Sequence, residues 1–386
     1  MNKALEKWQC RVHQRPHAVL SGDCHPKVQL ELANLTPRAE SKVRVTLSKS
    51  SPRVVAFWKI ASTTSFTNCL TDRASSMGSA DTLQRVAFEN RDRQGWTQLH
   101  HAAFGGDERM VNDLLTLQVS TAIRDDSGQT PLHIAAYNGQ DTIVKLLLQS
   151  GADKDSRDFK KETPLYLAAS QGLKSIVELF INEGADLEIT DKHDKTPLYV
   201  AAQNGHEAVA RLLIQKGANK EAAKVGEWVP LHAAAWYGHE AIVKLLLEHN
   251  CKREARSNDG KTPLYAAAKQ GHEGVTRLLL KNEAEKNVSA AGGWTPLHAA
   301  AWDGHEGAVR ALLEYGAYME ARSQRGETPL FSAARRGHVA IVKLLLERGA
   351  QKKVRANDGV SAVEVAKGNG HHAVVSVLKS HQRFGM

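Results

Sequence analysis

The chain holds 18 histidines among its 386 residues, a number that raises the question of acid–base or metal chemistry. Ten of them recur with a 33-residue period. A catalytic histidine has no reason to recur at a fixed interval, whereas a structural one does so in a repeated unit. The sequence therefore predicts structural roles for two sets, which are His100, His133, His232 and His298, and His206, His239, His272, His305, His338 and His371.

A loose cluster near the N-terminus contains Cys10, His13, His17, Cys24 and His25. Zinc sites are usually built from tight pairs such as C-x2-C with a matched second pair, and this cluster has neither. We therefore predict no metal site. The chain also has no phosphate-binding glycine loop and no serine-hydrolase or metalloprotease signature. We predict no catalytic residues, no cofactor and no enzymatic activity.

The period that places these histidines is clearest in the prolines. They recur every 33 residues in variants of the phrase TPLH, at Pro131, Pro164, Pro197, Pro230, Pro263, Pro296 and Pro329. A period of this length is typical of stacked repeats, in which each unit buries its apolar face on the next. Such a stack offers a long surface rather than one pocket. The period therefore predicts a repeat fold and favours binding over catalysis.

Residues 125–157 indicate how one unit folds. Thr130 suits a helix N-cap, and Pro131 suits the first helical position, where its missing N–H has no cost. The first helix should end at Gly139, and a second should run through apolar residues 143–148 to Gly151. In a later copy Glu283 takes the place of Gly151, and there we expect a distorted turn.

The phrase and period resemble those of the ankyrin repeat family across residues 92–380, in about nine copies. The resemblance implies an all-α repeat solenoid, a stack of helix-turn-helix units with β-turn or hairpin fingers. It also implies that the repeated histidines bind backbone groups, and that partners bind the finger tips and first helices on the concave side. The terminal copies depart from the phrase at Gln98, Ala362 and Glu364, as expected where an end unit meets water.

The flanking segments do not fit the repeat. Residues 1–80 are expected to be a basic N-terminal segment, partly disordered or folded as a small strand-rich unit built from the runs 28–32, 43–47 and 54–58. A capping helix or linker is expected over 81–91, and a short tail over 381–386.

The net charge of +9 is concentrated in residues 1–60, where 11 basic residues stand against 4 acidic ones. Such an arm can attract nucleic acid or an anionic surface, but no DNA-reading motif accompanies it, and a solvated tail is the plainer explanation. Four cysteines in so long a chain do not make a disulfide framework. With no long apolar run to span a membrane, the sequence predicts an intracellular protein, cytoplasmic or nuclear.

Positions that vary among the repeats are not required by the fold, so a partner can determine them. From residue 224 these positions carry aromatic and basic residues in alternate copies, namely Trp228, Trp236 and Tyr237, then Lys261 and Lys269, then Trp294 and Trp302, then Arg325, Arg335 and Arg336. Trp, Tyr and Arg are enriched in binding hot spots. We predict that this set binds an acidic, aromatic-containing or aliphatic-rich protein segment. Near-duplication of two repeats would account for the tryptophans as well.

These observations favour a monomeric, non-enzymatic scaffold or adaptor that binds protein partners through the concave face of the repeats. A rigid stack orders few of its own groups on association, so it loses little entropy. Two alternatives remain open. One is a transcriptional coregulator whose basic N-terminal arm contacts nucleic acid or a DNA-bound partner, and the other is a substrate adaptor of a ubiquitin ligase.

Overall fold

The computed structural model describes residues 88–223 and 226–380 of the chain. Within these ranges the secondary structure is helical, with one short 3-10 helix at Ala291–Gly293 and two isolated β-bridges in place of any sheet. The α-helices form successive pairs, with the bounds Gln98–Gly105 (α5) and Glu108–Thr116 (α6), Pro131–Tyr137 (α7) and Asp141–Gln149 (α8), Pro164–Gln171 (α9) and Lys174–Asn182 (α10), Pro197–Asn204 (α11) and Glu207–Gln215 (α12), Pro230–Tyr237 (α13) and Glu240–Glu248 (α14), Pro263–Gln270 (α15) and Glu273–Lys281 (α16), Pro296–Asp303 (α17) and Glu306–Glu314 (α18), Pro329–Arg336 (α19) and Val339–Glu347 (α20), and Ala362–Gly368 (α21) and His372–Ser380 (α22).

The start of each first helix follows from its local sequence. In α9 the Thr163 hydroxyl oxygen accepts a hydrogen bond from the backbone N–H of Tyr166, 3.1 Å away, and Pro164 occupies the first helical position. The helix ends at Gly172, whose left-handed φ of 75° has no steric cost for glycine. A Cβ at this glycine would also lie 2.5 Å from Nδ1 of His206 in the next unit. Both the backbone conformation and the close approach of His206 therefore require glycine here.

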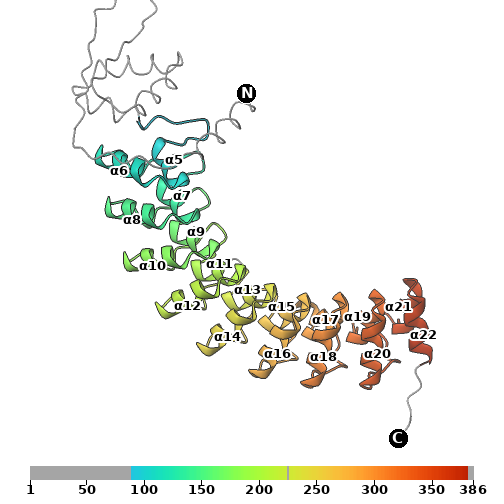
Figure 1. Cartoon of the computed structure of the whole chain (residues 1–386). Coiled ribbons are helices and arrows are strands. Elements are labelled where there is room, and N and C mark those ends of the chain that lie inside the picture. Colours follow the sequence, from blue (N-terminus) through green and yellow to red (C-terminus); the bar gives the residue numbers. More distant parts are fainter. Residues whose placement is uncertain (1–87, 224–225, 381–386) are drawn as a thin grey trace, which may run out of the picture. The chain divides into compact units, whose positions relative to one another are not determined.

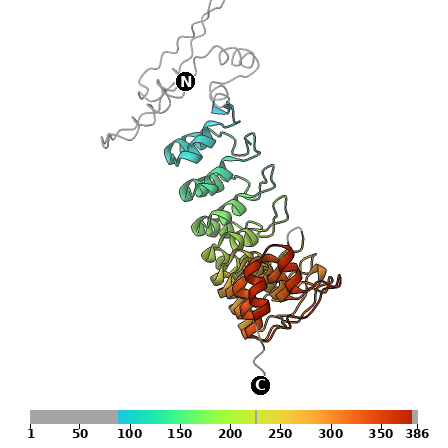
Figure 2. The ribbon, with the colours of Figure 1, turned by 90° about the vertical axis from the view of Figure 1, so that its right-hand side faces the viewer.

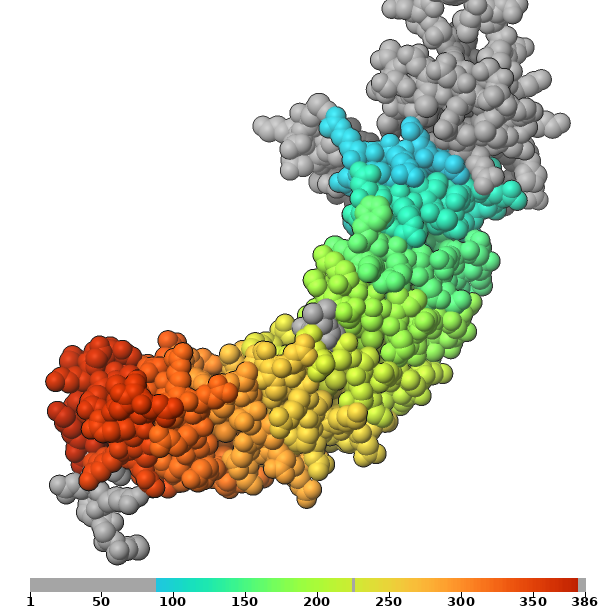
Figure 3. Space-filling model, turned by 180° about the vertical axis from the view of Figure 1, so that it is seen from behind, coloured from blue at the N-terminus to red at the C-terminus, as the bar shows by residue number. Residues whose placement is uncertain are grey.

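The helix pairs follow one another in a curved row, with the first helices along its inner side and the second helices along its outer side (Figure 1). First helices contact first helices of the neighbouring pairs, and second helices contact second helices. The connections between pairs project together on one side (Figure 2), and the space-filling view shows no break between successive pairs (Figure 3). The predicted all-α repeat stack is therefore confirmed.

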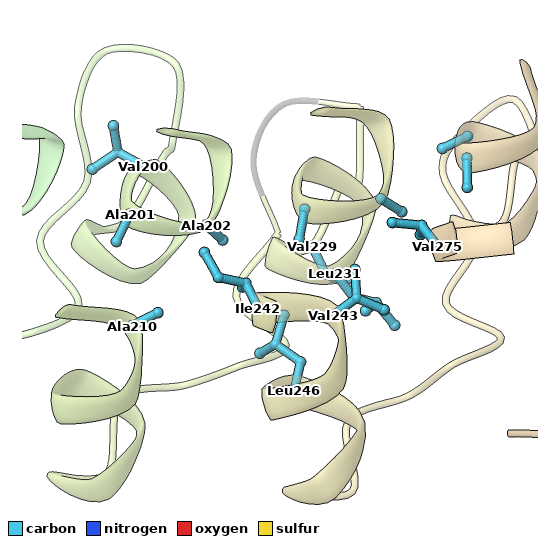
Figure 4. Packing of buried hydrophobic residues seen from close by; sticks show 14 of the residues in the cluster. Val200, Ala201, Ala202, Ala210, Val229, Leu231, Ile242, Val243, Leu246 and Val275 are labelled. Atoms are coloured by element: carbon cyan, nitrogen blue, oxygen red, sulfur yellow. The ribbon is translucent and has the colours of Figure 1, made fainter. Parts of the chain in front are cut away.

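The core is continuous along the row because each pair buries apolar side chains on the next. Figure 4 shows this where Ala202 of α11 and Ala210 of α12 face Leu231, Ile242 and other side chains of α13 and α14. All four of these residues are at most 1% exposed. Alanine on the first helices allows the close helix approach, and leucine, isoleucine and valine on the second helices fill the remaining space.

The connecting segments form fingers that are joined by single backbone hydrogen bonds. The Phe159 N–H donates to the carbonyl of Ser127 over 3.0 Å. Equivalent bonds recur at the same position of other fingers, from Asp126 to Gln94, Lys192 to Lys160, Asn258 to Gly226, Ala291 to Asp259, Gln324 to Gly292 and Asn357 to Arg325. One bond for each finger is too few to make a sheet, but it holds neighbouring fingers in a fixed order.

The expectation that Glu283 distorts its turn is wrong. Glu283 has a φ of 62°, close to the 80° of Gly151, and Ala284 donates to the carbonyl of Leu279 over 3.0 Å as Ala152 does to Leu147. The second helix and the following loop therefore keep their geometry. The cost is a strained backbone at a non-glycine residue rather than a changed turn.

The two ends of the described row show how the departures from the phrase are accommodated. At the last pair, Glu364 replaces the histidine, and its Oε2 accepts hydrogen bonds from the N–H and the hydroxyl of Ser361, each 2.7 Å. At the first pair, α5 begins at Gln98 without a proline, after the N-cap Thr97. A carboxylate is suited to capping at the last pair because its position is exposed.

Several sequence predictions lie outside the described residues. These are the basic arm, the proposed strands of the segment 1–80, the Cys/His cluster, the capping helix up to residue 87 and the tail 381–386. Of the predicted capping segment, Phe88 is described, and it packs against the core of the repeats. The predicted domain boundaries remain predictions.

Candidate functional site on the inner face

The histidines of the TPLH phrase are part of the scaffold. His133 is fully buried, and its Nδ1 accepts a hydrogen bond from the N–H of the N-cap Thr130, 3.1 Å away. The other ring nitrogen therefore carries the proton and donates to the carbonyl of Glu162 in the next finger, 3.1 Å away. His100, His232 and His298 make equivalent bonds, to the carbonyls of Gln129, Lys261 and Glu327.

Burial lowers the pKa of His133, His232 and His298 to about 4, and it lowers that of His100 as well. These rings are therefore neutral at pH 7, with both nitrogens already bonded. They have no free group with which to move a proton for a substrate.

Five of the six histidines in the second set connect a repeat to the one before it. Nε2 of His272 lies 2.8 Å from the carbonyl oxygen of Trp236, which is 36 residues earlier. His206, His239, His338 and His371 make the same contact with the carbonyls of Ser170, Gln203, Trp302 and Arg335. The interpretation of the repeated histidines as structural residues agrees with these contacts. His305 is the exception among the described residues, because its ring lies against Gly271 without the hydrogen bond to the preceding repeat.

In several repeats, two positions meet on the inner side of the row. One is the residue directly before the N-cap of the first helix, and the other lies eight residues later in its last turn; we call them the inner-face pair. In the fifth described helix pair these are Trp228 and Trp236, whose rings meet edge to face with centroids 5.4 Å apart. Trp294 and Trp302 repeat this geometry at 5.3 Å. All four indoles are half-buried.

Other repeats use the inner-face pair for polar contacts. Nζ of Lys195 donates to Oε1 of Gln203 over 2.9 Å. Arg335 and Glu327 form an ion pair of 3.0 Å in which the Glu327 side chain is only 4% exposed. In these repeats the two members of the pair are matched to each other in size or charge, whereas the pair Lys261 and Lys269 carries two like charges.

The basic residues predicted at the site fall into two groups. Lys261 and Arg335 are paired with carboxylates of the chain, Lys261 with Asp259 at 2.9 Å. Among the described residues, no carboxylate lies within ion-pair distance of Lys269, Arg325 or Arg336. The Arg336 guanidinium instead lies over the ring of Trp302, 5.2 Å from its centroid.

Tyr237, the remaining predicted site residue, is 50% exposed, and its ring stacks on that of His239 with centroids 6.3 Å apart. The predicted residues therefore do not form one pocket. The structure places the two Trp pairs at equivalent positions two repeats apart, with Lys269 on the helix between them.

The first described repeat carries an aromatic group that was not predicted from the sequence. Trp96 and Phe104 occupy its inner-face pair with ring centroids 5.5 Å apart, and Phe104 is 54% exposed. Tyr137 follows at the position of Phe104 in the next repeat and is 49% exposed. The 33-residue spacing that relates Trp96 to Trp228 was the signal that could have revealed them.

The described part of the chain was also compared with the requirements of metal binding, thiol chemistry and membrane insertion. There, no cluster of three or more His, Cys, Asp or Glu side chains could hold a metal ion. Burial raises the pKa of the Cys251 thiol to about 12, which keeps it protonated and unreactive at pH 7. Over the same residues, none of the helices has the length and apolar character needed to cross a membrane.

The family model described as "Ankyrin repeats (3 copies)" matches residues 72–158, 157–224, 231–323 and 318–385. The chain belongs to the ankyrin repeat family. Its repeats indicate a protein–protein interaction domain, and ankyrin repeat proteins are generally non-enzymatic interaction modules. Comparison with curated protein sequences gave no match.

Proposed function

We propose that this ankyrin repeat protein is a binding scaffold or adaptor inside the cell, and that its main partner site is the inner face from Trp228 to Arg336. The observation that carries the proposal is the duplicated Trp pair. Four indoles are half-buried along the first helices, although a fold of this kind accepts polar residues at the same positions, as Lys195 and Gln203 show. Trp is the residue type most enriched in hot spots.

The scaffold supports such a role because it holds the site rigid. The carbonyls of Trp236 and Trp302 are each bound by a histidine of the next repeat, at 2.8 and 2.9 Å. Fingers on the same side are tied by backbone hydrogen bonds. A surface that is ordered before the partner arrives loses little conformational entropy on binding.

The test is affinity capture from the native cell with three versions of the full chain. These are the wild type, the double variant Trp236→Ala with Trp302→Ala, and a control with Tyr315→Ala and Tyr318→Ala. Tyr315 and Tyr318 are 39% and 60% exposed aromatic residues at the end of the outer helix α18. We expect the inner-face variant to lose the partners that the control retains. An unchanged partner list would reject this site.

A second candidate is the transcriptional coregulator, which the excess of basic residues in 1–60 favours. If it is right, the full chain binds DNA with a steep dependence on salt that disappears when residues 1–60 are deleted. Binding of DNA that survives the deletion, or no binding, would reject it.

A further inference from the structure

The two Trp pairs belong to a larger unit that occurs twice. In each copy an edge-to-face Trp pair is followed, at the same helix position of the next repeat, by a basic residue. Trp228 and Trp236 are followed by Lys269 on α15, and Trp294 and Trp302 by Arg335 on α19. The interplanar angles of the two pairs are 70° and 74°, so the two aromatic surfaces are alike in shape as well as in composition.

The charge of this face favours an anionic partner. Among the described residues, Lys269, Arg325 and Arg336 have no carboxylate within ion-pair distance. On the described finger tips and first helices from Glu227 to Arg336, two acidic residues, Glu227 and Asp303, lie outside the ion pairs already described. Glu227 faces the side-chain amide of Asn258, which leaves Asp303 at the end of α17. Unpaired cations thus outnumber unpaired carboxylates at the surface between and beyond the Trp pairs.

The distance between the two Trp pairs determines how far apart two side chains of a bound segment must lie to reach both. Trp236 and Trp302 are two first helices apart, since α13 contacts α15 and α15 contacts α17. Packed helices lie about 8–10 Å apart, so the two indoles are separated by roughly 16–20 Å along the row. An extended chain advances about 3.3 Å for each residue, so this distance corresponds to about five or six residues. Lys269 lies midway, about three residues from either indole.

We propose that the inner face binds an extended acidic segment of a partner protein that carries two large apolar side chains about five or six residues apart. One apolar side chain packs on the Trp228–Trp236 pair and the other on the Trp294–Trp302 pair. A carboxylate midway between them meets Lys269, and a carboxylate beyond the second meets Arg336, which already lies over Trp302. This inference rests on the proposed function and names the chemistry of its partner.

Selection from a displayed library of random 16-residue peptides tests the inference with the full chain as the target. The double variant Trp236→Ala, Trp302→Ala serves for counter-selection. We expect enriched peptides to carry two large apolar residues about five or six positions apart with Asp or Glu between them. Enrichment of basic peptides, of peptides without this spacing, or of none that depend on the tryptophans would overturn the inference.

A synthetic peptide with the selected spacing then measures the role of charge by fluorescence anisotropy. Lys269→Glu should weaken binding at least tenfold and Lys269→Gln by less, whereas Lys145→Glu on the outer helix α8 makes the same charge change and should leave affinity within twofold. Equal affinity for all three would overturn the role of Lys269. If cellular partners still depend on the tryptophans while the peptides show no such pattern, the proposed function stands and the inference about an acidic segment fails.

Discussion

His272 lies across Gly238 and donates from Nε2 to the carbonyl oxygen of Trp236 over 2.8 Å. A Cβ at Gly238 would be 2.6 Å from Nδ1 of this ring, so the contact requires both residues. The end of α13, where Trp236 stands, is therefore held by the following repeat. His338 and Trp302 have the same relationship at 2.9 Å. The scaffold and the proposed binding surface are thus mechanically connected.

Replacement of His272 by alanine should loosen the end of α13. The loss of a hydrogen bond that leaves a partly buried carbonyl unpaired costs about 1–3 kcal/mol. Hydrogen exchange in α13 to α16 should accelerate correspondingly. His249→Ala, which removes a histidine with no hydrogen bond from its side chain in the described part, is the control. Equal exchange in the two variants would show that the His272 contact does not stabilise the repeat.

The buried histidines make the stability of the repeats sensitive to acid. Burial lowers the pKa of His133 and His298 to about 4, below the usual 6.5 of an unfolded chain. Their contribution is therefore complete above pH 6.5 and is lost as the pH falls toward 4, because the unfolded state takes up protons first. Each of these two histidines should therefore lower the free energy of unfolding by about 2 kcal/mol at pH 5 relative to pH 7.

Tyrosine is a suitable replacement for these histidines, because Tyr166, Tyr199 and Tyr265 occupy the equivalent position in other repeats. In urea unfolding at pH 7 and pH 5, the double variant His133→Tyr, His298→Tyr should lose less stability than the wild type. The same pH dependence in both proteins would contradict the assignment.

Glu283→Gly should stabilise the protein. Glu283 has a φ of 62°, and its exposed carboxylate makes only a loose ion pair of 4.0 Å with Arg253, so relief of about 1 kcal/mol of left-handed strain should outweigh the loss of that pair. The reverse change at the equivalent position, Gly184→Ala, should cost a similar amount, because open space around Gly184 leaves strain as the main effect. Thermal unfolding measures both. A lower melting temperature for Glu283→Gly would mean that its side chain has a stabilising contact.

Arg335→Ala should destabilise the protein more than Arg336→Ala does. The Glu327 carboxylate, 4% exposed, would lose its 3.0 Å partner, at a cost of about 3 kcal/mol for a buried charge left unpaired. Arg336→Ala removes only the contact with Trp302, worth about 0.5–1 kcal/mol. Urea unfolding compares the two variants. Substituting Glu327→Lys with Arg335→Gln, which copies Lys195 and Gln203, should recover most of the stability, and no recovery would contradict the pairing.

The repeated residues made most of the scaffold predictable. Thr130 and Pro131 start a helix, and Gly139 and Gly151 end two, through local rules that do not depend on the rest of the chain. Glu283 shows the limit of such rules. Taken alone, a glutamate disfavours the left-handed turn. The preceding helix α16 packs against α18 of the next repeat, and burial of its Leu279 and Leu280 outweighs a strain of about 1 kcal/mol.

The amino-acid sequence alone determined the period, the helix boundaries and which residues vary, because these depend on neighbours along the chain and on comparison between repeats. The tertiary structure decided which variable residues meet. Trp228 lies against Trp236, and Trp96 and Phe104 form a further pair. Arg335 is bound to Glu327, while Lys269 has no such partner among the described residues. These relationships all depend on how a finger folds back over its helix. Contacts between side chains eight residues apart arise from that fold, and residue types alone do not reveal them.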